Sequence, residues 1–321
     1  MHNQFLLCAA ACATLAGCTA EPEPAAPAAQ TQAAATTPDF PEMIVAERGG
    51  FIPEGLEYDS KNGRFLTGSL SEGTIFQVHP DGRVTPVVSD PDLRASVGIE
   101  VDEPRDRLLV ANSDDSVFRG AGTGQAKLGV YNLTTGERIA MVDLAAAITD
   151  APDDAVHFAN DVAVGGDGTA YITDTRMNVI YRVTPDYQAS VLHRFEPMEG
   201  LALNGIVYHP SGYLLVASGA TLYKVPLDDP AQAKQVTLPE PVPGQDGMLW
   251  TADERLVIVS NSNNRVVALT SADNWTTAQL AGVATYSVQA TTAAAVGGDI
   301  YIVHPQFAGK EPPSIERVTF R

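Results

Sequence analysis

Short hydrophobic runs alternate with polar turns along most of the chain, and one arrangement of them returns at nearly regular intervals. Each copy opens with a two-residue signature, continues as an alternating apolar stretch, passes a turn and ends in a second apolar run. Counted at the second signature residue, successive copies are 43, 63, 44, 42 and 45 residues apart. The six signatures are Glu54-Gly55, Val97-Gly98, Asn160-Asp161, Asn204-Gly205, Asp246-Gly247 and Thr291-Thr292.

Short strands at this period are typical of β-propellers with four strands in each blade. The six copies predict an all-β, six-bladed β-propeller whose four-stranded antiparallel blades surround a central channel. Two β-sandwiches are the alternative, but they give no reason for a sixfold period. The last copy supplies strands near 291–304 and 314–320, and its missing strand could come from Met43–Glu47. Such pairing would close the ring with the start of the domain.

The amino terminus carries a targeting signal. Residues 5–17 are an apolar run of mostly small residues, too short to span a membrane and typical of a secretory signal. The run ends in Leu15-Ala16-Gly17 before Cys18, which resembles the lipobox of bacterial lipoproteins. This resemblance implies cleavage before Cys18 and lipidation of its thiol, although Met1–Gln4 lacks the usual Lys or Arg. An ordinary signal peptide cleaved nearby is the alternative.

The domain organisation follows from these segments. We expect a lipoprotein signal peptide over 1–17, the lipidated cysteine and a flexible Ala/Pro-rich tether over 18–41, and the propeller over 42–321. The expected location is the cell envelope, either the periplasmic side of a membrane or the cell surface, with the lipid anchor as the sole membrane contact. All three cysteines lie within the first eighteen residues, which excludes disulfides, thiolate metal sites and cysteine nucleophiles from the propeller.

The charge balance excludes one class of partner. The chain has 20 Lys and Arg against 39 Asp and Glu, a net charge of −19. Nucleic-acid binding needs clustered cations, and the sequence has no such cluster. We expect a monomer that binds a small molecule.

The repeat also predicts a site. In a propeller the innermost strands line the channel, so the residues that open them converge on one mouth. Four of the six first signature residues carry carboxylate or carboxamide oxygens: Glu54, Asn160, Asn204 and Asp246. Oxygen donors of this kind suit a divalent cation, most of all Ca²⁺, with Mg²⁺, Mn²⁺ and Zn²⁺ as alternatives. Each of these residues could instead close a turn with its side chain.

The motifs around these positions resemble the senescence marker protein/gluconolactonase/luciferin-regenerating-enzyme family of six-bladed propellers. The resemblance spans nearly all of 48–307, through Pro53-Glu54-Gly55, Phe158-Ala159-Asn160-Asp161, Leu203-Asn204-Gly205-Ile206 and Gln245-Asp246-Gly247-Met248. It implies that Glu54, Asn204 and Asp246 are metal ligands. It places Asn160 beside both the metal and the substrate, so we count Asn160 in both sets.

The family implies a metal-dependent lactonase or related ester hydrolase. The cation would polarise a lactone carbonyl and activate water, with Asp246 as the general base. Sugar-binding members carry Arg where this chain has Phe158, so an apolar ring there indicates a less polar substrate, such as an alkyl lactone or aryl ester. Phe158 could instead pack beneath the rim.

Two further residues are candidates for substrate contact. The loops that leave the second strand of each blade should lie on the metal side, and Asn112 and Asp174 are polar residues in two of them. A non-catalytic, metal-stabilised binding or scaffold propeller tethered to the envelope remains the alternative function, because a fold alone does not decide function.

Overall fold

The computed structural model describes residues 39–196, 202–309 and 311–321. The chain divides into residues 1–36 and residues 37–321, and every element given below belongs to the second unit. The predicted signal peptide, Cys18 and most of the tether lie outside the described residues. Within the described residues, no helix is long and apolar enough to cross a membrane.

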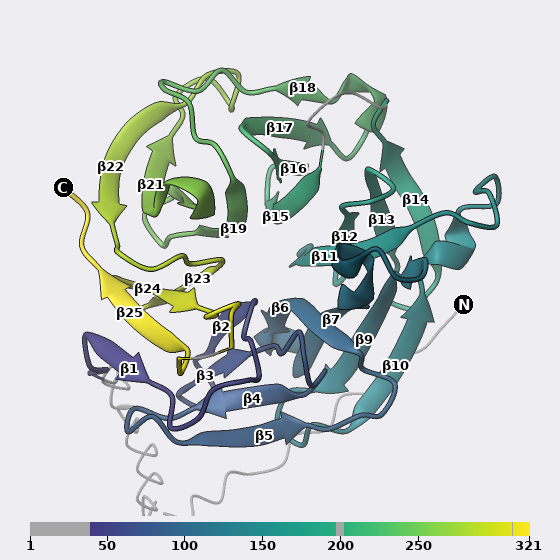
Figure 1. The fold of residues 1–321 in the computed structure, drawn as a ribbon. Coiled ribbons are helices and arrows are strands. Elements are labelled where there is room, and N and C mark those ends of the chain that lie inside the picture. The colour runs from purple at the N-terminus through teal and green to yellow at the C-terminus, as the bar shows by residue number, and fades with distance from the viewer. Residues whose placement is uncertain (1–38, 197–201, 310) are drawn as a thin grey trace, which may run out of the picture. The chain divides into compact units, whose positions relative to one another are not determined.

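Six antiparallel four-stranded sheets stand around a common centre as the blades of a propeller (Figure 1). Blade 1 holds β2 (Leu56–Asp59), β3 (Arg64–Thr67), β4 (Ile75–Val78) and β5 (Val84–Val88). Blade 2 holds β6 (Ala95–Asp102), β7 (Arg107–Ser113), β9 (Lys127–Asn132) and β10 (Arg138–Asp143). Blade 3 holds β11 (His157–Val164), β12 (Ala170–Asp174), β13 (Val179–Val183) and β14 (Ala189–Arg194), with β8 (Gly124–Gln125) parallel to the start of β11.

The second half of the ring repeats this order. Blade 4 holds β15 (Leu203–His209), β16 (Tyr213–Ser218), β17 (Thr221–Pro226) and β18 (Lys234–Gln235). Blade 5 holds β19 (Gln245–Trp250), β20 (Leu256–Ser260), β21 (Arg265–Thr270) and β22 (Gln279–Thr285). Blade 6 holds β23 (Ala293–Val296), β24 (Asp299–His304), β25 (Ser314–Val318) and β1 (Met43–Val45). The predicted six-bladed propeller is confirmed.

The ring closes through its first strand. β1 pairs antiparallel with β25, with Met43 opposite Glu316 and Val45 opposite Ser314. Between them, Ile44 is 1% exposed and packs into the cluster shared by blades 1 and 6. The predicted closure is therefore confirmed, and it depends on hydrogen bonds and apolar packing.

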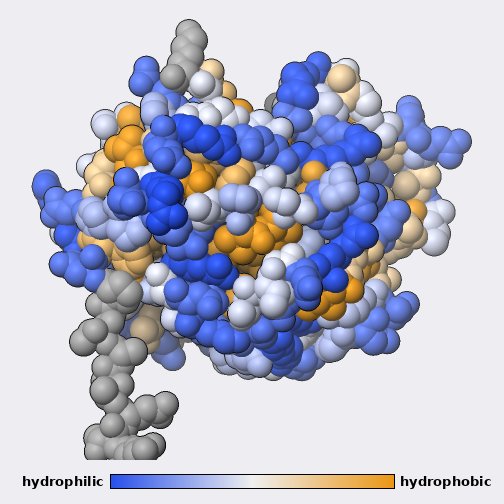
Figure 2. All heavy atoms as spheres, turned by 90° about the horizontal axis from the view of Figure 1, so that it is seen from below, coloured by the Kyte–Doolittle hydropathy of each residue, from blue (hydrophilic) through white to orange (hydrophobic). Residues whose placement is uncertain are grey.

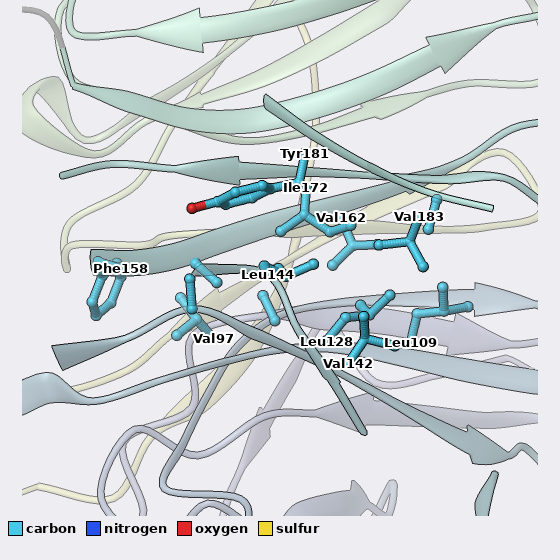
Figure 3. Close-up of a cluster of buried hydrophobic side chains, with 14 of the residues drawn as sticks. Val97, Leu109, Leu128, Val142, Leu144, Phe158, Val162, Ile172, Tyr181 and Val183 are labelled. Carbon is cyan, nitrogen blue, oxygen red and sulfur yellow. The ribbon is translucent and has the colours of Figure 1, made fainter. Parts of the chain in front are cut away.

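The hydrophobic core lies between neighbouring blades. Strands β7, β16 and β20 are buried along their whole length, since each is covered by a blade on both faces. This explains the continuous apolar second run of each repeat. The largest cluster joins blades 2 and 3 through residues such as Leu109, Leu128 and Tyr181 (Figure 3). On the side of the domain seen in Figure 2, hydrophilic residues predominate and hydrophobic ones form separate patches.

Helical structure among the described residues is limited to short 3₁₀ segments in connections. These are η1 (Glu103–Arg105), η2 (Asp115–Arg119), η3 (Ala145–Ala147), η4 (Pro230–Gln232) and η5 (Asn261–Asn263).

Candidate functional site

Glycine is the second residue of four signatures, where it lets the innermost strands of neighbouring blades come into direct contact. The Gly55 amide donates to the Val97 carbonyl at 3.1 Å, and the Gly247 amide donates to the Thr291 carbonyl at 2.9 Å. A Cβ added to Gly205 would lie 2.2 Å from the Asp246 carbonyl oxygen. Glycine is therefore a steric requirement here, and the contact brings the first signature residues together at one end of the channel.

Asp161 replaces this glycine in blade 3 and makes the contact in another way. Its Oδ1 accepts a hydrogen bond from the Val162 amide at 2.9 Å, and its Oδ2 accepts one from the Ile206 amide of blade 4 at 3.1 Å. Burial raises the pKa of Asp161 to about 7, against the lowering effect of these two amides. No role was predicted for Asp161, although it is the one charged residue among the six second signature positions.

Glu54 and Asp246 meet at the signature end of the channel, where they are 8% and 3% exposed. Burial raises the pKa of Glu54 well above its ordinary value, and the charges of Asp246 and Asp161 raise it further. Burial also raises the pKa of Asp246 to about 7, while hydrogen bonds from the Asn261 and Asn204 side chains oppose the shift. The Asn261 Nδ2 donates to Asp246 Oδ2 at 2.5 Å. The structure thus brings Glu54, Asn204 and Asp246 together.

Asn160 completes a set that we call the polar ring: Glu54, Asn160, Asn204 and Asp246. Asn160 is 7% exposed, and its Nδ2 donates to Thr175 Oγ1 at 2.9 Å. Thr175 Oγ1 in turn donates to the Leu203 carbonyl at 2.6 Å, one residue before Asn204. The two remaining first signature residues, Val97 and Thr291, are buried, and Thr291 Oγ1 donates to the Glu54 carbonyl at 2.8 Å.

The donor chemistry of the polar ring fits a divalent cation. Two buried carboxylates repel each other's negative charge, and two carboxamides supply neutral oxygens nearby. A hard cation would offset the repulsion and prefers such ligands. Within the described part of the chain, no group of three or more His, Cys, Asp or Glu residues could hold a metal, so a site here depends on the asparagine oxygens.

Asn112 and Asp174 are both engaged in structural hydrogen bonds. Asn112 Oδ1 accepts from the Arg94 amide at 3.0 Å, and its Nδ2 donates to the Asp92 carbonyl at 2.9 Å. Asp174 Oδ1 accepts three backbone amides, and its Oδ2 contacts His157 Nδ1 at 3.3 Å and Tyr181 Oη at 3.1 Å. Their contact with substrate stays a prediction.

Phe158 lies inside the cluster between blades 2 and 3 and is 2% exposed (Figure 3). The same cluster contains Val97 and Tyr181. This position corresponds to packing beneath the rim, the alternative left open by the sequence.

A cavity of about 280 Å³ occupies the channel below the polar ring. We call it the central cavity. It begins at the second signature position, with Asp161 and Thr292, and follows the inner strands towards the opposite end. No residue of the polar ring is among its lining residues.

Comparison with known proteins identifies the fold. No protein-family model matches the chain, and no curated protein matches it. Several solved structures, however, match the chain in fold. The major allergen Mala s 1 of Malassezia sympodialis superposes with a TM-score of 0.73 at 18% identity, over 88% of this chain and 97% of the allergen. A luciferin-regenerating enzyme gives 0.60 at 11% identity, over 86% and 94% of the two chains. A Xanthomonas campestris gluconolactonase gives 0.58 at 13%, over 87% and 89%.

The chain has the fold of the gluconolactonase-like six-bladed propellers. At these identities the likeness concerns the fold alone. The fold agrees with the one that the signature motifs imply.

Proposed function

We propose that the protein is a metal-dependent hydrolase of lactones or related esters, with its reaction centre at the polar ring. The observation that carries the proposal is the convergence of Glu54 and Asp246 from two separate blades. The two side chains lie close enough for the charge of Asp246 to raise the pKa of Glu54. Burying a carboxylate is costly unless it is compensated, and closing the channel needs no charge. The names of two structural neighbours, a gluconolactonase and a luciferin-regenerating enzyme, support enzymatic activity in this fold.

The four residues of the polar ring would hold the cation through their oxygens, with Ca²⁺ favoured over Mg²⁺, Mn²⁺ and Zn²⁺. When bound, the cation would supply Lewis acidity for a carbonyl oxygen that gains negative charge.

Asp246 is the proposed general base, which takes the proton of the attacking water. The Asn261 side chain donates to Asp246 Oδ2 and fixes the orientation of the carboxylate. Asn160, held by Thr175, is the proposed contact for the substrate. The substrate class is a lactone or ester; the preference for an apolar one depended on Phe158, which packs between blades.

The test is a hydrolysis assay on lactones of increasing chain length and on aryl esters. The purified protein is stripped with a chelator and reloaded with Ca²⁺, Mg²⁺, Mn²⁺ or Zn²⁺. We expect a cation to restore activity, and Asp246→Asn or Glu54→Gln to lower kcat/KM at least about 100-fold, as for other groups that stabilise developing charge. Asp299→Asn, an exposed acid paired with Arg317, is the control that keeps full activity. Unchanged hydrolysis in Asp246→Asn would refute the assignment.

A binding or scaffold propeller with a structural cation is the second candidate, and one observation favours it. The two carboxylates and Asn160 are buried, with Glu54 the more exposed carboxylate at 8%, and only Asn204 of the ring is partly exposed. An enclosed cation is typical of a structural site, whereas a catalytic one keeps an open position. A cation that raises the unfolding temperature in the same preparations, with no hydrolysis of any lactone or ester, would establish this alternative.

We also propose, from the sequence, that the protein is exported and lipidated at Cys18. The mass of the protein extracted from membranes should exceed that of the chain from Cys18 onwards by a lipid moiety. Cys18→Ala should release the protein into the soluble fraction. Recovery of unmodified protein from membranes would contradict lipidation.

A further inference from the structure

The central cavity is built in layers by the inner strands of all six blades. Below Asp161 comes an apolar layer, then a layer with two glutamates, then a layer rich in aromatic side chains. The apolar layer is Ile99, Val162, Ile206, Met248 and Ala293. The layer with the two glutamates contains Glu57 and Glu100 beside Ala163, Val207, Leu249 and Ala294. The last contains Tyr58, Tyr208 and Trp250 beside Val164 and Ala295.

The charges of the cavity lie on one side of it. Glu57, Glu100 and Asp161 belong to the consecutive blades 1, 2 and 3, whereas Tyr208 and Trp250 belong to blades 4 and 5. The cavity therefore has an acidic wall facing an apolar and aromatic one.

The acids of the cavity have no basic partner among its lining residues, which include no Lys, Arg or His. Acids two residues further along the same strands are paired. Asp59 binds Arg64 at 2.8 Å, and Asp102 binds Arg107 at 2.6 Å. Burial raises the pKa of Glu100 to about 8, and the charges of Asp161 and Asp102 add to the shift. The strands thus pair their acids with arginines outside the cavity but leave those inside it without a basic partner.

The aromatic side is formed by rings that also contact other aromatic residues. Trp250 lines the cavity, and its ring centroid lies 5.2 Å from that of His209 and 5.3 Å from that of Trp275. Tyr208 lines the cavity and stacks on Tyr171 at 6.3 Å. The cavity thus combines acids that have no basic partner with aromatic rings that are held by their neighbours.

We propose that the central cavity binds a small organic cation: a protonated amine with an aromatic or aliphatic tail. The ammonium group offers three donors to Glu57, Glu100 and Asp161. The tail packs against the apolar layer and against the rings of Tyr208 and Trp250.

The shape of the cavity favours an organic ligand over a metal ion. Its volume of about 280 Å³ is close to the lower end of small-molecule sites and far larger than a bare ion. Ca²⁺ takes six to eight oxygen ligands around it, but here the carboxylates lie on one side and apolar side chains on the other. The proposal is independent of the hydrolase, because it concerns binding without turnover.

Calorimetric titration of the full-length protein tests the inference with a matched pair of probes. Tyramine carries the ammonium group, and tyrosol replaces it with a neutral hydroxyl. We expect tyramine to bind at least about tenfold more tightly, which corresponds to about 1.4 kcal/mol. Glu57→Gln and Glu100→Gln should each weaken tyramine binding about tenfold, and the double variant should abolish it. Glu72→Gln, an exposed acid paired with Arg48, is the control with unchanged affinity.

Three results would overturn the proposal. The first is equal affinity for tyramine and tyrosol, and the second is undiminished tyramine binding in the double variant. The third is a wild type that gives no heat with tyramine but binds Ca²⁺, while the double variant does not bind Ca²⁺. Glutamine keeps the shape of glutamate, and thermal unfolding of each variant shows that it is folded before it is titrated.

Discussion

The two levels of the channel use the same six strands in opposite ways. At the polar ring, glycines let neighbouring strands touch, and the polar side chains fill the axis and are nearly all buried. A few residues further along each strand, the same blades enclose the central cavity. Both levels gather carboxyl groups, and the lower one encloses a cavity of about 280 Å³.

The difference shows that convergence of charge and available space are separate properties of a propeller. The spacing of the polar ring depends on close backbone contacts, so its donors are fixed in place. The width of the cavity depends on the size of the side chains that line it, and blade 6 lines it with the small side chains of Ala293–Ala295. We therefore assign the ring to a small cation and the cavity to a larger one, and the predictions below test this division.

The largest expected effect comes from filling the contact that builds the polar ring. In Gly205→Ala the new Cβ would meet the Asp246 carbonyl, a backbone atom that cannot move aside. We expect a loss of about 3 kcal/mol of unfolding free energy, measured by denaturant titration. Gly298→Ala is the matched control, since a Cβ there has nothing within 4 Å, and it should change stability by less than about 0.5 kcal/mol. Equal stability of the two variants would show that the ring is not held by close backbone contact.

Asp161 lies at the boundary between the two levels, and its replacement should be the next most costly. Asp161→Ala leaves the amides of Val162 and Ile206 without their acceptor, which should cost about 2 kcal/mol. Asp161→Asn keeps one acceptor oxygen and removes a buried charge, so its stability should lie between those of wild type and Asp161→Ala. Denaturant titration at neutral pH measures all three proteins. An alanine variant as stable as wild type would show that the carboxylate does not link blades 3 and 4.

The pH dependence of stability should report the unpaired acids of the cavity. The pKa of Glu100 is raised from 4.5 to about 8, so the folded protein holds this proton where the unfolded chain has lost it. The resulting stability is present below about pH 4.5 and is lost as the pH rises through about 8. Glu100→Gln should therefore reduce the fall in unfolding free energy between pH 5 and pH 8 by at least about 1 kcal/mol.

An acid with the opposite shift provides the comparison. Backbone amides of an exposed turn lower the pKa of Asp273 to about 2, so its contribution is lost only when the pH falls towards that value. Asp273→Asn should leave the slope between pH 5 and pH 8 unchanged. If Glu100→Gln also leaves it unchanged, Glu100 is not held protonated by the fold.

The sequence predicted the fold and the polar ring because both depend on position within a repeat. The period gives the number of blades, and a residue that opens an inner strand must face the axis whatever its neighbours are. Glu54 and Asp246 could be chosen on that basis, and the structure brings them together. The role of Asp161 was accessible in the same way, as a charged residue where the other copies have glycine or threonine.

Loops and cavity could not be predicted in this way. Asp174 looks like a pocket residue from its place in a polar loop, but the same carboxylate accepts two backbone amides of its own turn and the amide of Phe158 on β11. Polarity alone does not distinguish these two uses. The cavity depends on how far six strands stand apart, which is set by the packing between blades and has no local signal in the chain.

The smallest expected effect concerns Phe158, for which sequence and structure suggest different roles. Its ring packs between blades 2 and 3, so Phe158→Leu should lower the unfolding free energy by about 1 kcal/mol, as for other apolar exchanges in a core. If packing is its only role, KM for the best lactone or ester stays unchanged while stability falls. Leu109→Val, in the same cluster, provides the matched packing loss away from the polar ring. A changed KM with unaltered stability would instead make Phe158 a substrate contact.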